Sequence, residues 1–366
     1  MAKSKNSDIT CLFLNLVRAG LWDEEVQLSR YGEMDYSAIY KLAEEQSVVG
    51  LVTAGLENVK DVTVTKEVVL QFVGSTLQIE QRNKEVNGFV VKLTRRLKNE
   101  QVFSLLVKGQ GVAQCYTKPL WRAAGDVDLL LDEDNCRKAK EVLFPIAYDI
   151  QPEDVKTKHQ ALKIMGVDVE LHGKMPFGLS KRVDGEIDEV LDESLKGGGV
   201  STWKVEGDDI YLPKPDNHII LVFTHFLHHF FIEGVGLRQI CDWCRMLWTY
   251  RDSLNYGLLE ERINRMGLMT EWRVFGSLAV DILGMLRDAM PFYDARYSTK
   301  AEKVLKRILK SGNFGHNNDL SYRSNYKGMA YKVVATWRRF WDFASLVPVF
   351  PLDAPRFFVG YLRNKV

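Results

Sequence analysis

The first hundred residues carry hydrophobic positions at helical spacing. Between Asp35 and Gln46, the apolar residues Ile39, Leu42 and Ala43 fall on one face of a helix. Asp35 begins that stretch and can cap it, because its carboxylate can accept a hydrogen bond from a backbone N–H of the first turn. The helices predicted in this part of the chain cover residues 1–20, 35–46, 48–56 and 65–99.

Beyond residue 100 the pattern changes to short apolar runs that are typical of strands. Val102–Val107 is predicted to be a buried strand, and Asp126–Leu131 a second one. His159–Ile164 and Val167–His172 form a predicted hairpin, since only Met165 and Gly166 separate them. A helix is predicted at 135–143, a glycine loop at 197–199 and one more short strand at 209–212.

Helical spacing returns from Asn217 to about Leu309, and prolines 348, 351 and 355 interrupt the aromatic tail that follows. This order of elements predicts an α+β fold, in which helical regions flank a small core with a short mixed β-sheet. The predicted parts are an N-terminal helical region at 1–100, an α+β core at 101–213 and a C-terminal helical region at 214–366 with a basic, aromatic tail.

Composition excludes several classes of protein. The chain has 366 residues, of which 46% are hydrophobic and 27% charged, as in ordinary soluble domains. Its 49 basic and 48 acidic residues give a net charge of +1, so no overall basic field points to DNA. The five cysteines are scattered, which predicts reduced thiols and a cytoplasmic protein rather than a disulfide framework.

The sequence contains no evident membrane span or export signal. No window approaches the ~18 unbroken apolar residues that a spanning helix needs. Ile9–Val17 imitates a signal peptide, but Asn15 interrupts it and Arg18 continues a helical pattern. We therefore expect a packed helix at the start of the chain.

Acidic residues on two predicted strands suggest a metal site. Side chains alternate along a strand, so Asp126 and Asp128 share one face. Asp168, Glu170 and His172 share a face of the later strand in the same way. If the two strands are neighbours, Glu170 can complete a carboxylate triad for Mg²⁺ or Mn²⁺, which prefer oxygen ligands. We interpret Asp168 as a flanking residue and His172 as a residue that orients Glu170 or packs.

A glycine-containing loop follows the first predicted strand. Gly109, Gln110 and Gly111 lie between that strand and a probable helix, where backbone N–H groups can approach phosphates. Lys108 and Arg122 are the nearest cations for a triphosphate. The loop and the carboxylates together predict a site for a metal-bound nucleotide.

These residues resemble a known family. A strand, Lys108-Gly109, a helix, Arg122-x-x-Gly-Asp-x-Asp128 and a later strand that ends in Glu-Leu-His172 resemble the DNA polymerase β-like nucleotidyltransferase superfamily. More narrowly, they resemble the bacterial uncharacterised nucleotidyltransferase family, which is often found near surface-polysaccharide genes. Residues 42–51 and 234–243 resemble its N-terminal and C-terminal helical segments, so the resemblance covers most of the chain up to about residue 250.

The resemblance implies magnesium-dependent transfer of a nucleoside monophosphate from a nucleoside triphosphate to an acceptor hydroxyl, with release of pyrophosphate. Asp126 and Asp128 would bind the metal, Glu170 would be the third carboxylate, and Gly109 would be the glycine of the nucleotide loop. The acceptor would be a small molecule or a sugar-like compound. Gln110 departs from the Gly-Ser or Gly-Gly of the superfamily, which removes a serine contact to phosphate.

Two other functions stay open. A toxin-like enzyme would keep the fold and modify RNA or protein, although the net charge of +1 argues against a long RNA surface. A catalytically silent nucleotide- or glycan-binding protein is compatible with Gln110. The three retained carboxylates argue against it, because clustered like charges cost stability without a metal ion.

The predicted C-terminal helices carry a second group of candidate ligands. His225 and His229 share a helix face, and Cys241 and Cys244 follow on the next helix, so the four residues have the chemistry of a zinc site. No loop-borne Cys-x-x-Cys surrounds them, which favours packing and predicts no bound zinc. Arg238 follows two glycines and either pairs with Asp242 four residues later or contacts a nucleotide phosphate.

The tail is strongly basic. Between Tyr322 and Val366, eight basic residues stand against two acidic ones and are interleaved with Trp, Phe and Tyr. Such mixtures suit peripheral contact with a membrane or a polyanion. A solvated basic face over an aromatic core is the simpler interpretation.

Overall fold

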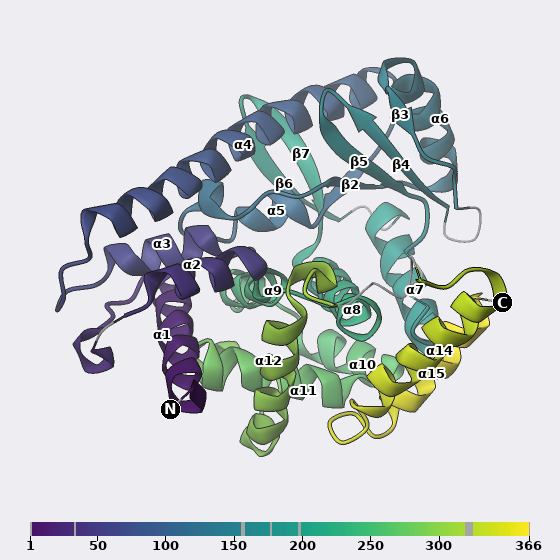
Figure 1. The fold of residues 1–366 in the computed structure, drawn as a ribbon. Coiled ribbons are helices and arrows are strands. Elements are labelled where there is room, and N and C mark those ends of the chain that lie inside the picture. Colours follow the sequence, from purple (N-terminus) through teal and green to yellow (C-terminus); the bar gives the residue numbers. More distant parts are fainter. Residues whose placement is uncertain are drawn as a thin grey trace.

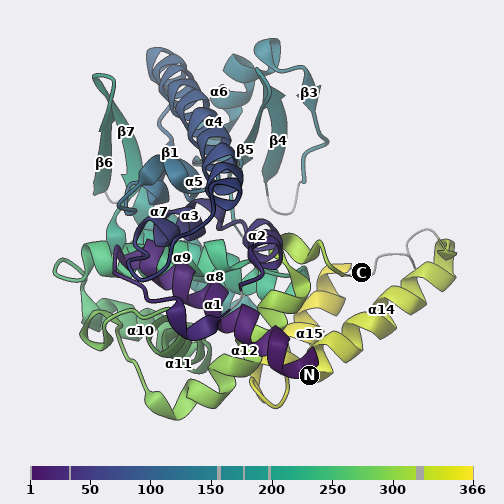
Figure 2. The ribbon, with the colours of Figure 1, turned by 60° about the vertical axis from the view of Figure 1, so that its left-hand side comes forward.

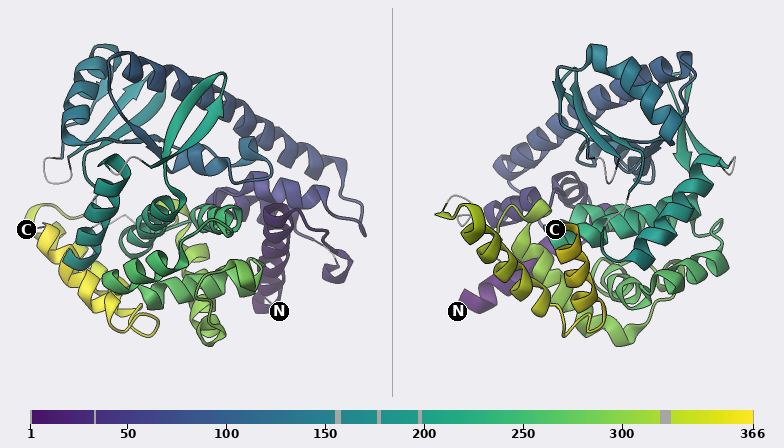
Figure 3. Two further views of the ribbon diagram at one scale, coloured as in Figure 1. Left: turned by 180° about the vertical axis from the view of Figure 1, so that it is seen from behind. Right: turned by 90° about the vertical axis from the view of Figure 1, so that its right-hand side faces the viewer.

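The protein is described by a computed structural model, in which a mixed β-sheet lies at one end of a larger body of helices (Figure 1). The α+β class predicted from the sequence is confirmed. Figure 3 shows the same arrangement from behind and from the side. The structure describes residues 2–32, 34–154, 158–175, 178–196, 199–318 and 325–365.

Four helices form the N-terminal region, as predicted. They are α1 (Ala2–Trp22), α2 (Tyr36–Glu45), α3 (Val49–Glu57) and α4 (Lys66–Asn99). The Asp35 carboxylate caps α2 by accepting a hydrogen bond from the backbone N–H of Ala38. Helices α1 and α3 touch at Gly55, where a Cβ atom would lie 2.1 Å from the carbonyl oxygen of Leu16. Only glycine allows this close approach.

The main sheet has five strands in the order β1-β2-β5-β4-β3. Strands β2 and β5 are parallel neighbours, and Asp128 lies directly opposite Glu170. The other pairs in this sheet are antiparallel. The strands are β1 (Leu105–Val107), β2 (Val127–Leu130), β3 (Asp149–Ile150), β4 (His159–Ile164) and β5 (Val167–His172).

Helices cover the apolar face of this sheet. Val90 of α4 and Ala139 of α6 (Glu133–Leu143) belong to one core cluster with Leu129 and Val169 of the strands. In Figure 2, α4 runs as one long rod beside the strands. Because side chains alternate along a strand, burying Leu129 and Val169 here turns Asp128 and Glu170 to the opposite face.

Two elements between residues 173 and 213 were not anticipated from the sequence. Helix α7 (Lys181–Lys196) precedes a two-stranded antiparallel sheet made of β6 (Val200–Val205) and β7 (Asp208–Pro213). Only β7 corresponds to a predicted strand. The glycine loop predicted at 197–199 lies largely outside the described residues.

The C-terminal region is helical, as predicted. Its core is aromatic: Phe223 and Phe226 of α8 pack against Trp243 of α9 and Trp272 of α11. The helices are α8 (Pro215–Ile232), α9 (Leu237–Tyr250), α10 (Tyr256–Met266), α11 (Met269–Ser277), a π-helical turn at Leu278–Ile282, and α12 (Ser298–Ser311). Short 3₁₀ turns occur at Ser29–Tyr31, Pro119–Trp121, Phe144–Ile146, Arg287–Ala289, Ala295–Tyr297 and Asn313–Gly315.

The tail consists of α14 (Gly328–Ala344) and α15 (Asp353–Lys365). Pro355 does not break a helix but lies in the first turn of α15, where its missing N–H has no helical partner to lose. The prediction of an aromatic core under a basic face is confirmed for Phe343 of α14, which is buried, but is wrong for Trp337 and Trp341, which are exposed. In the described part of the chain, no helix is both long and apolar enough to span a membrane.

Candidate active site

Three carboxylates meet on the open face of the main sheet. Oxygen atoms of Asp126, Asp128 and Glu170 all lie within 4.8 Å of one another. The parallel pairing of β2 and β5 brings them together, as the sequence predicted. Asp128 is buried, whereas Asp126 is exposed at the start of β2. Asp168, on the same strand as Glu170, is exposed and pairs with Lys163. The carboxylate set has the oxygen chemistry that Mg²⁺ or Mn²⁺ requires.

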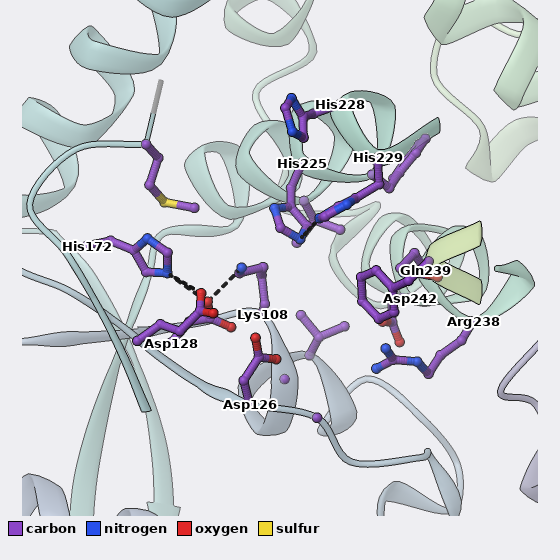
Figure 4. A pocket seen from close by; sticks show the side chains of 18 of the residues that line it. Lys108, Asp126, Asp128, His172, His225, His228, His229, Arg238, Gln239 and Asp242 are labelled. Carbon is purple, nitrogen blue, oxygen red and sulfur yellow. Dashed lines mark hydrogen bonds and ion pairs between the residues drawn. The ribbon is translucent and has the colours of Figure 1, made fainter. Parts of the chain in front are cut away.

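Lys108 links the glycine loop to these carboxylates. Its ammonium lies 2.7 Å from an Oδ atom of Asp128 (Figure 4). Its backbone has a φ of +58°, and its N–H donates a 3.1 Å hydrogen bond to Nε2 of His218. Gly109 follows with a φ of +41° and begins α5 (Gly109–Ala113). The left-handed backbone therefore turns the chain so that Lys108 and Gly109 both line the cavity.

Two histidines complete the acidic cluster, and sequence reasoning found only one of them. His172 Nε2 lies 2.8 Å from Asp128 and 3.3 Å from Glu170, so it contacts both carboxylates. His159 Nε2 lies 3.2 Å from Glu170. In the β4–β5 hairpin, His159 is paired directly with His172. Counting outward from the Met165-Gly166 turn would have revealed this partner.

The charges within the cluster raise the pKa of one carboxyl group and lower the pKa values of the other two. The pKa of Asp126 is raised chiefly by the negative charge of the neighbouring Asp128 carboxylate. Burial would also raise the pKa of Asp128, but the Lys108 ammonium and His172 outweigh it and lower that pKa. Burial opposes ionisation of Glu170 too, yet hydrogen bonds from His159 and His172 bring its pKa far below the ordinary value. Asp126 is thus the carboxylate that gains most from an added cation.

A cavity of about 590 Å³ lies between the carboxylates and the C-terminal helices. Its far wall is built from α8 and the start of α9, which carry His225, His229 and Arg238 (Figure 4). Glu233, the residue after α8, also lines it. Arg238 donates a hydrogen bond to the Ala123 carbonyl, and burial lowers its pKa. The cavity therefore has an acidic wall on the sheet side and an arginine and histidines opposite.

His225, His229 and Glu233 form a hydrogen-bonded chain along α8. The Nε2 atoms of the two histidines are 3.1 Å apart, and His229 Nδ1 lies 2.9 Å from a Glu233 oxygen. The pKa of His225 is well below its ordinary value because of burial and the nearby Lys108 charge. A neutral His225 can share one proton with His229 while His229 donates to Glu233.

Residues 32–284 match the sequence model of the family described as "Uncharacterised nucleotidyltransferase". The chain belongs to this family. No curated protein and no solved structure matches the chain. The matched residues include the three carboxylates, the glycine loop and both walls of the cavity. General nucleotidyl transfer is the activity that this membership supports.

Not all of the predicted nucleotide loop lies at the site of this nucleotidyltransferase. The buried Gln110 side chain donates hydrogen bonds to Asn83 and Asn87 of α4. Gly111 packs against Leu212 and is not among the described residues that line the cavity. The Gln110 side chain thus anchors α5 to α4, and contact of the loop backbone with a nucleotide stays a prediction. Gly109 is the loop glycine that lines the cavity.

Arg122 also differs from its predicted role. Its Nε and Nη2 atoms donate to the two oxygens of Asp242 at 2.7 and 2.8 Å, and Nη1 donates to the Ala123 carbonyl. Tyr116 donates to the same carboxylate at 2.8 Å. The expected pair between Arg238 and Asp242 is thus wrong, because Arg122 and Tyr116 bind the Asp242 oxygens. Arg122 borders the cavity, but its donors are used within the protein.

The cysteines lie away from the histidines. Cys241 and Cys244 are fully buried in the hydrophobic core on α9, and burial raises the pKa of both thiols. Among the described residues, the groups with three ligand atoms within 4.8 Å are His159, Glu170 and His172, and the three carboxylates. Neither group contains a cysteine. The absence of zinc stays a prediction.

Proposed function

We propose that this protein transfers a nucleoside monophosphate from a nucleoside triphosphate to an acceptor hydroxyl. The oxygen of the hydroxyl attacks the α-phosphorus, the bond to the β-phosphate oxygen breaks, and pyrophosphate leaves. The observation that carries this proposal is the convergence of Asp126, Asp128 and Glu170 on one sheet face. It also favours membership of the DNA polymerase β-like superfamily.

The site residues fit a divalent metal ion. Like charges raise the pKa of Asp126, and Asp128 already holds the Lys108 ammonium, so the cluster attracts cations. Asp126 and Asp128 would hold Mg²⁺ or Mn²⁺, and Glu170 would bind a second ion or activate the acceptor. When bound, such ions neutralise phosphate charge and orient the reacting oxygens.

The protein's own groups position the triphosphate. Gly109 allows phosphate oxygens close to the backbone at the start of α5. Lys108 exchanges its Asp128 partner for a phosphate oxygen when the triphosphate enters, and Arg238 contributes charge from the far wall. Arg122, which is held by Asp242, supports the wall rather than binding phosphate directly.

The acceptor enters on the side of α8. The chain of His225, His229 and Glu233 lines the cavity there, and the Glu233 carboxylate can accept a hydrogen bond from a hydroxyl compound. A small molecule or saccharide in a cytoplasmic reaction, for example in polysaccharide synthesis, fits a cavity of about 590 Å³ better than DNA does. The carboxylate cluster favours this enzyme over a silent binding protein.

The first test measures thermal stability with magnesium and each nucleoside triphosphate. Ligand that binds only the folded state stabilises it, by about 2.7 kcal/mol at a hundredfold excess over Kd. We expect the wild type and D168N to show this shift and the D126N/D128N double variant to lose it while remaining folded. An unchanged shift in the double variant would contradict the assignment of the metal site.

Labelled nucleoside triphosphates incubated with cell extract then identify the product. Label on a small molecule or saccharide supports the proposal. Label on RNA or protein indicates the toxin-like alternative. A thermal shift without any labelled product, in every extract and with every base, indicates a nucleotide-binding protein without transfer activity.

A further inference from the structure

Helix α14 exposes a stripe of large apolar side chains. Met329, Val333, Trp337 and Trp341 recur every four residues, which places them on one face of the helix. They are 74%, 62%, 60% and 56% exposed, and Phe340 beside them is 42% exposed. In Figure 2, α14 extends away from the rest of the helical body. An exposed aromatic stripe of this kind is unusual for a free surface and marks a contact site.

The side chains of the stripe pack against one another and form one continuous surface. The rings of Trp337, Phe340 and Trp341 pack on one another, with centroids 5.5 to 5.9 Å apart. Phe340 continues this packing onto Phe358 of α15. The rings are therefore held outward by their neighbours, and a shallow apolar groove lies along Val333, Trp337 and Phe358.

A basic groove of about 500 Å³ runs beside the stripe, between α14, α12 and the end of α8. Among the described residues, four cations line it, two from α12 and two from α14, against Asp342 and Glu233. Trp337 borders both this groove and the apolar one. An anionic group seated in the basic groove would therefore lie next to inserted aromatic rings. The four cations are Arg307, Lys310, Arg338 and Arg339.

The positive charge of the tail indicates which kind of partner binds the stripe and the basic groove. Over residues 325–365 there are seven basic and two acidic residues. A second copy of this chain would bring the same positive charge to the contact, which opposes self-association through this face. An anionic bilayer supplies negative headgroups at its surface and acyl chains beneath them. The headgroups pair with the basic side chains, and the acyl chains cover the exposed tryptophans beside them.

We propose that α14 docks the protein on anionic membrane surfaces. Met329, Val333, Trp337, Phe340 and Trp341 enter the boundary between headgroups and acyl chains, and the basic groove binds lipid phosphate. The helix lies in the plane of the membrane surface, as an amphipathic helix does, and does not cross the bilayer. Helix α14 contributes no residue to the catalytic cavity, so substitutions of its tryptophans leave the residues of that cavity in place.

The test is cosedimentation of the full-length protein with two kinds of vesicle. One kind is phosphatidylcholine alone and the other contains equal parts of phosphatidylcholine and phosphatidylglycerol. We expect binding to the anionic vesicles, weaker binding at high salt, and little binding to phosphatidylcholine. The W337A/W341A double variant should bind about tenfold or more weakly, since it removes the two largest interfacial side chains.

Helix α4 provides the matched control. Leu70 and Leu77 are 71% and 56% exposed there, so L70A/L77A removes a similar exposed apolar pair without touching the tail. Its vesicle binding should equal that of the wild type. Three results would each overturn the proposal: no sedimentation of the wild type, equal sedimentation of W337A/W341A, or equal binding to uncharged vesicles.

Two other occupants give distinct results. A dimer in light scattering that W337A/W341A dissociates would make this face a contact between two copies. Binding to polyglutamate without binding to vesicles would make it a site for an acidic polypeptide. Either result replaces the membrane assignment and leaves the nucleotidyltransferase proposal untouched.

Discussion

At the scale of single residues, the carboxylates of this cluster have different neighbours and therefore different tasks. His159 and His172 hold Glu170 from two sides, whereas Asp128 is held by Lys108 and His172. Asp126 has no ion pair among the described residues, and its pKa is raised mainly by Asp128. We therefore assign cation binding chiefly to the two aspartates and the chemical step chiefly to Glu170.

Glu170 and Asp168 provide a direct comparison, because they share one face of β5. E170Q should keep most nucleotide affinity and lose transfer by about a hundredfold or more, as expected for a residue that acts in the chemical step. D168N should change little, since Asp168 is exposed and paired with Lys163 outside the cavity. Calorimetry of nucleotide binding and turnover on the identified acceptor separate the two effects. An inactive D168N beside an active E170Q would mean that the active face is wrongly assigned.

At the scale of elements, α8 fixes the turn between β1 and α5. Nε2 of the buried His218 accepts the backbone N–H of Lys108, at the residue whose φ is +58°. A non-glycine residue in this region needs outside support, because its backbone is strained. His218 therefore positions both Lys108 and Gly109 without touching the cavity itself.

This contact predicts a pH dependence. Burial lowers the pKa of His218 to about 4, whereas an unfolded histidine titrates near 6.5. Between those values the unfolded chain binds a proton that the folded chain does not, so stability falls as pH falls through this window. The loss attributable to His218 is up to about 3 kcal/mol. H218Q keeps an acceptor for Lys108 and should lose less stability than the wild type between neutral and mildly acidic pH.

Chemical unfolding at several pH values measures this difference. H316Q is the matched control, because it makes the same substitution at a histidine that is exposed. Equal slopes of stability against pH in H218Q and wild type would contradict a neutral, buried His218.

The elements that sequence reasoning found are those with a local signal. The bounds of β4 and β5 were predicted to the residue, because alternating side chains flank a Met-Gly turn. Strand β6 was missed because its alternation of polar and apolar residues is short, from Thr202 to Val205, and none of its residues is fully buried. Helix α7 did carry a signal, since Val183, Ile187 and Val190 are buried at helical spacing, and the prediction overlooked it.

At the scale of the whole molecule, one buried ion pair joins the two walls of the cavity. Arg122 precedes β2, and Asp242 lies on α9, 120 residues later in the chain. Both side chains are almost fully buried. No local sequence pattern identifies Asp242 as the partner of Arg122. Sequence reasoning therefore placed Arg122 at the nucleotide phosphates. His159 was missed for a different reason: the register of the predicted hairpin pairs it with His172, and the sequence prediction did not use that register.

Removing one member of this pair should destabilise the protein strongly. D242N leaves the Arg122 guanidinium buried without a counter-charge, which costs about 3–5 kcal/mol. D192N breaks an exposed pair with Lys196 and should cost less than about 1 kcal/mol. Urea unfolding compares the two variants. Equal stability of D242N and D192N would show that the buried pair does not hold the walls together.

The two walls of the cavity come from different parts of the chain. The carboxylates of the proposed metal site lie at β2 and β5, and the opposite histidines and arginine lie on α8 and α9. Because of this separation, one wall can change without the other. Substitutions on the helices can reshape the space offered to an acceptor while the strand register that aligns the carboxylates stays unchanged. Evolution or protein design can therefore change the acceptor of such a site by altering one wall alone.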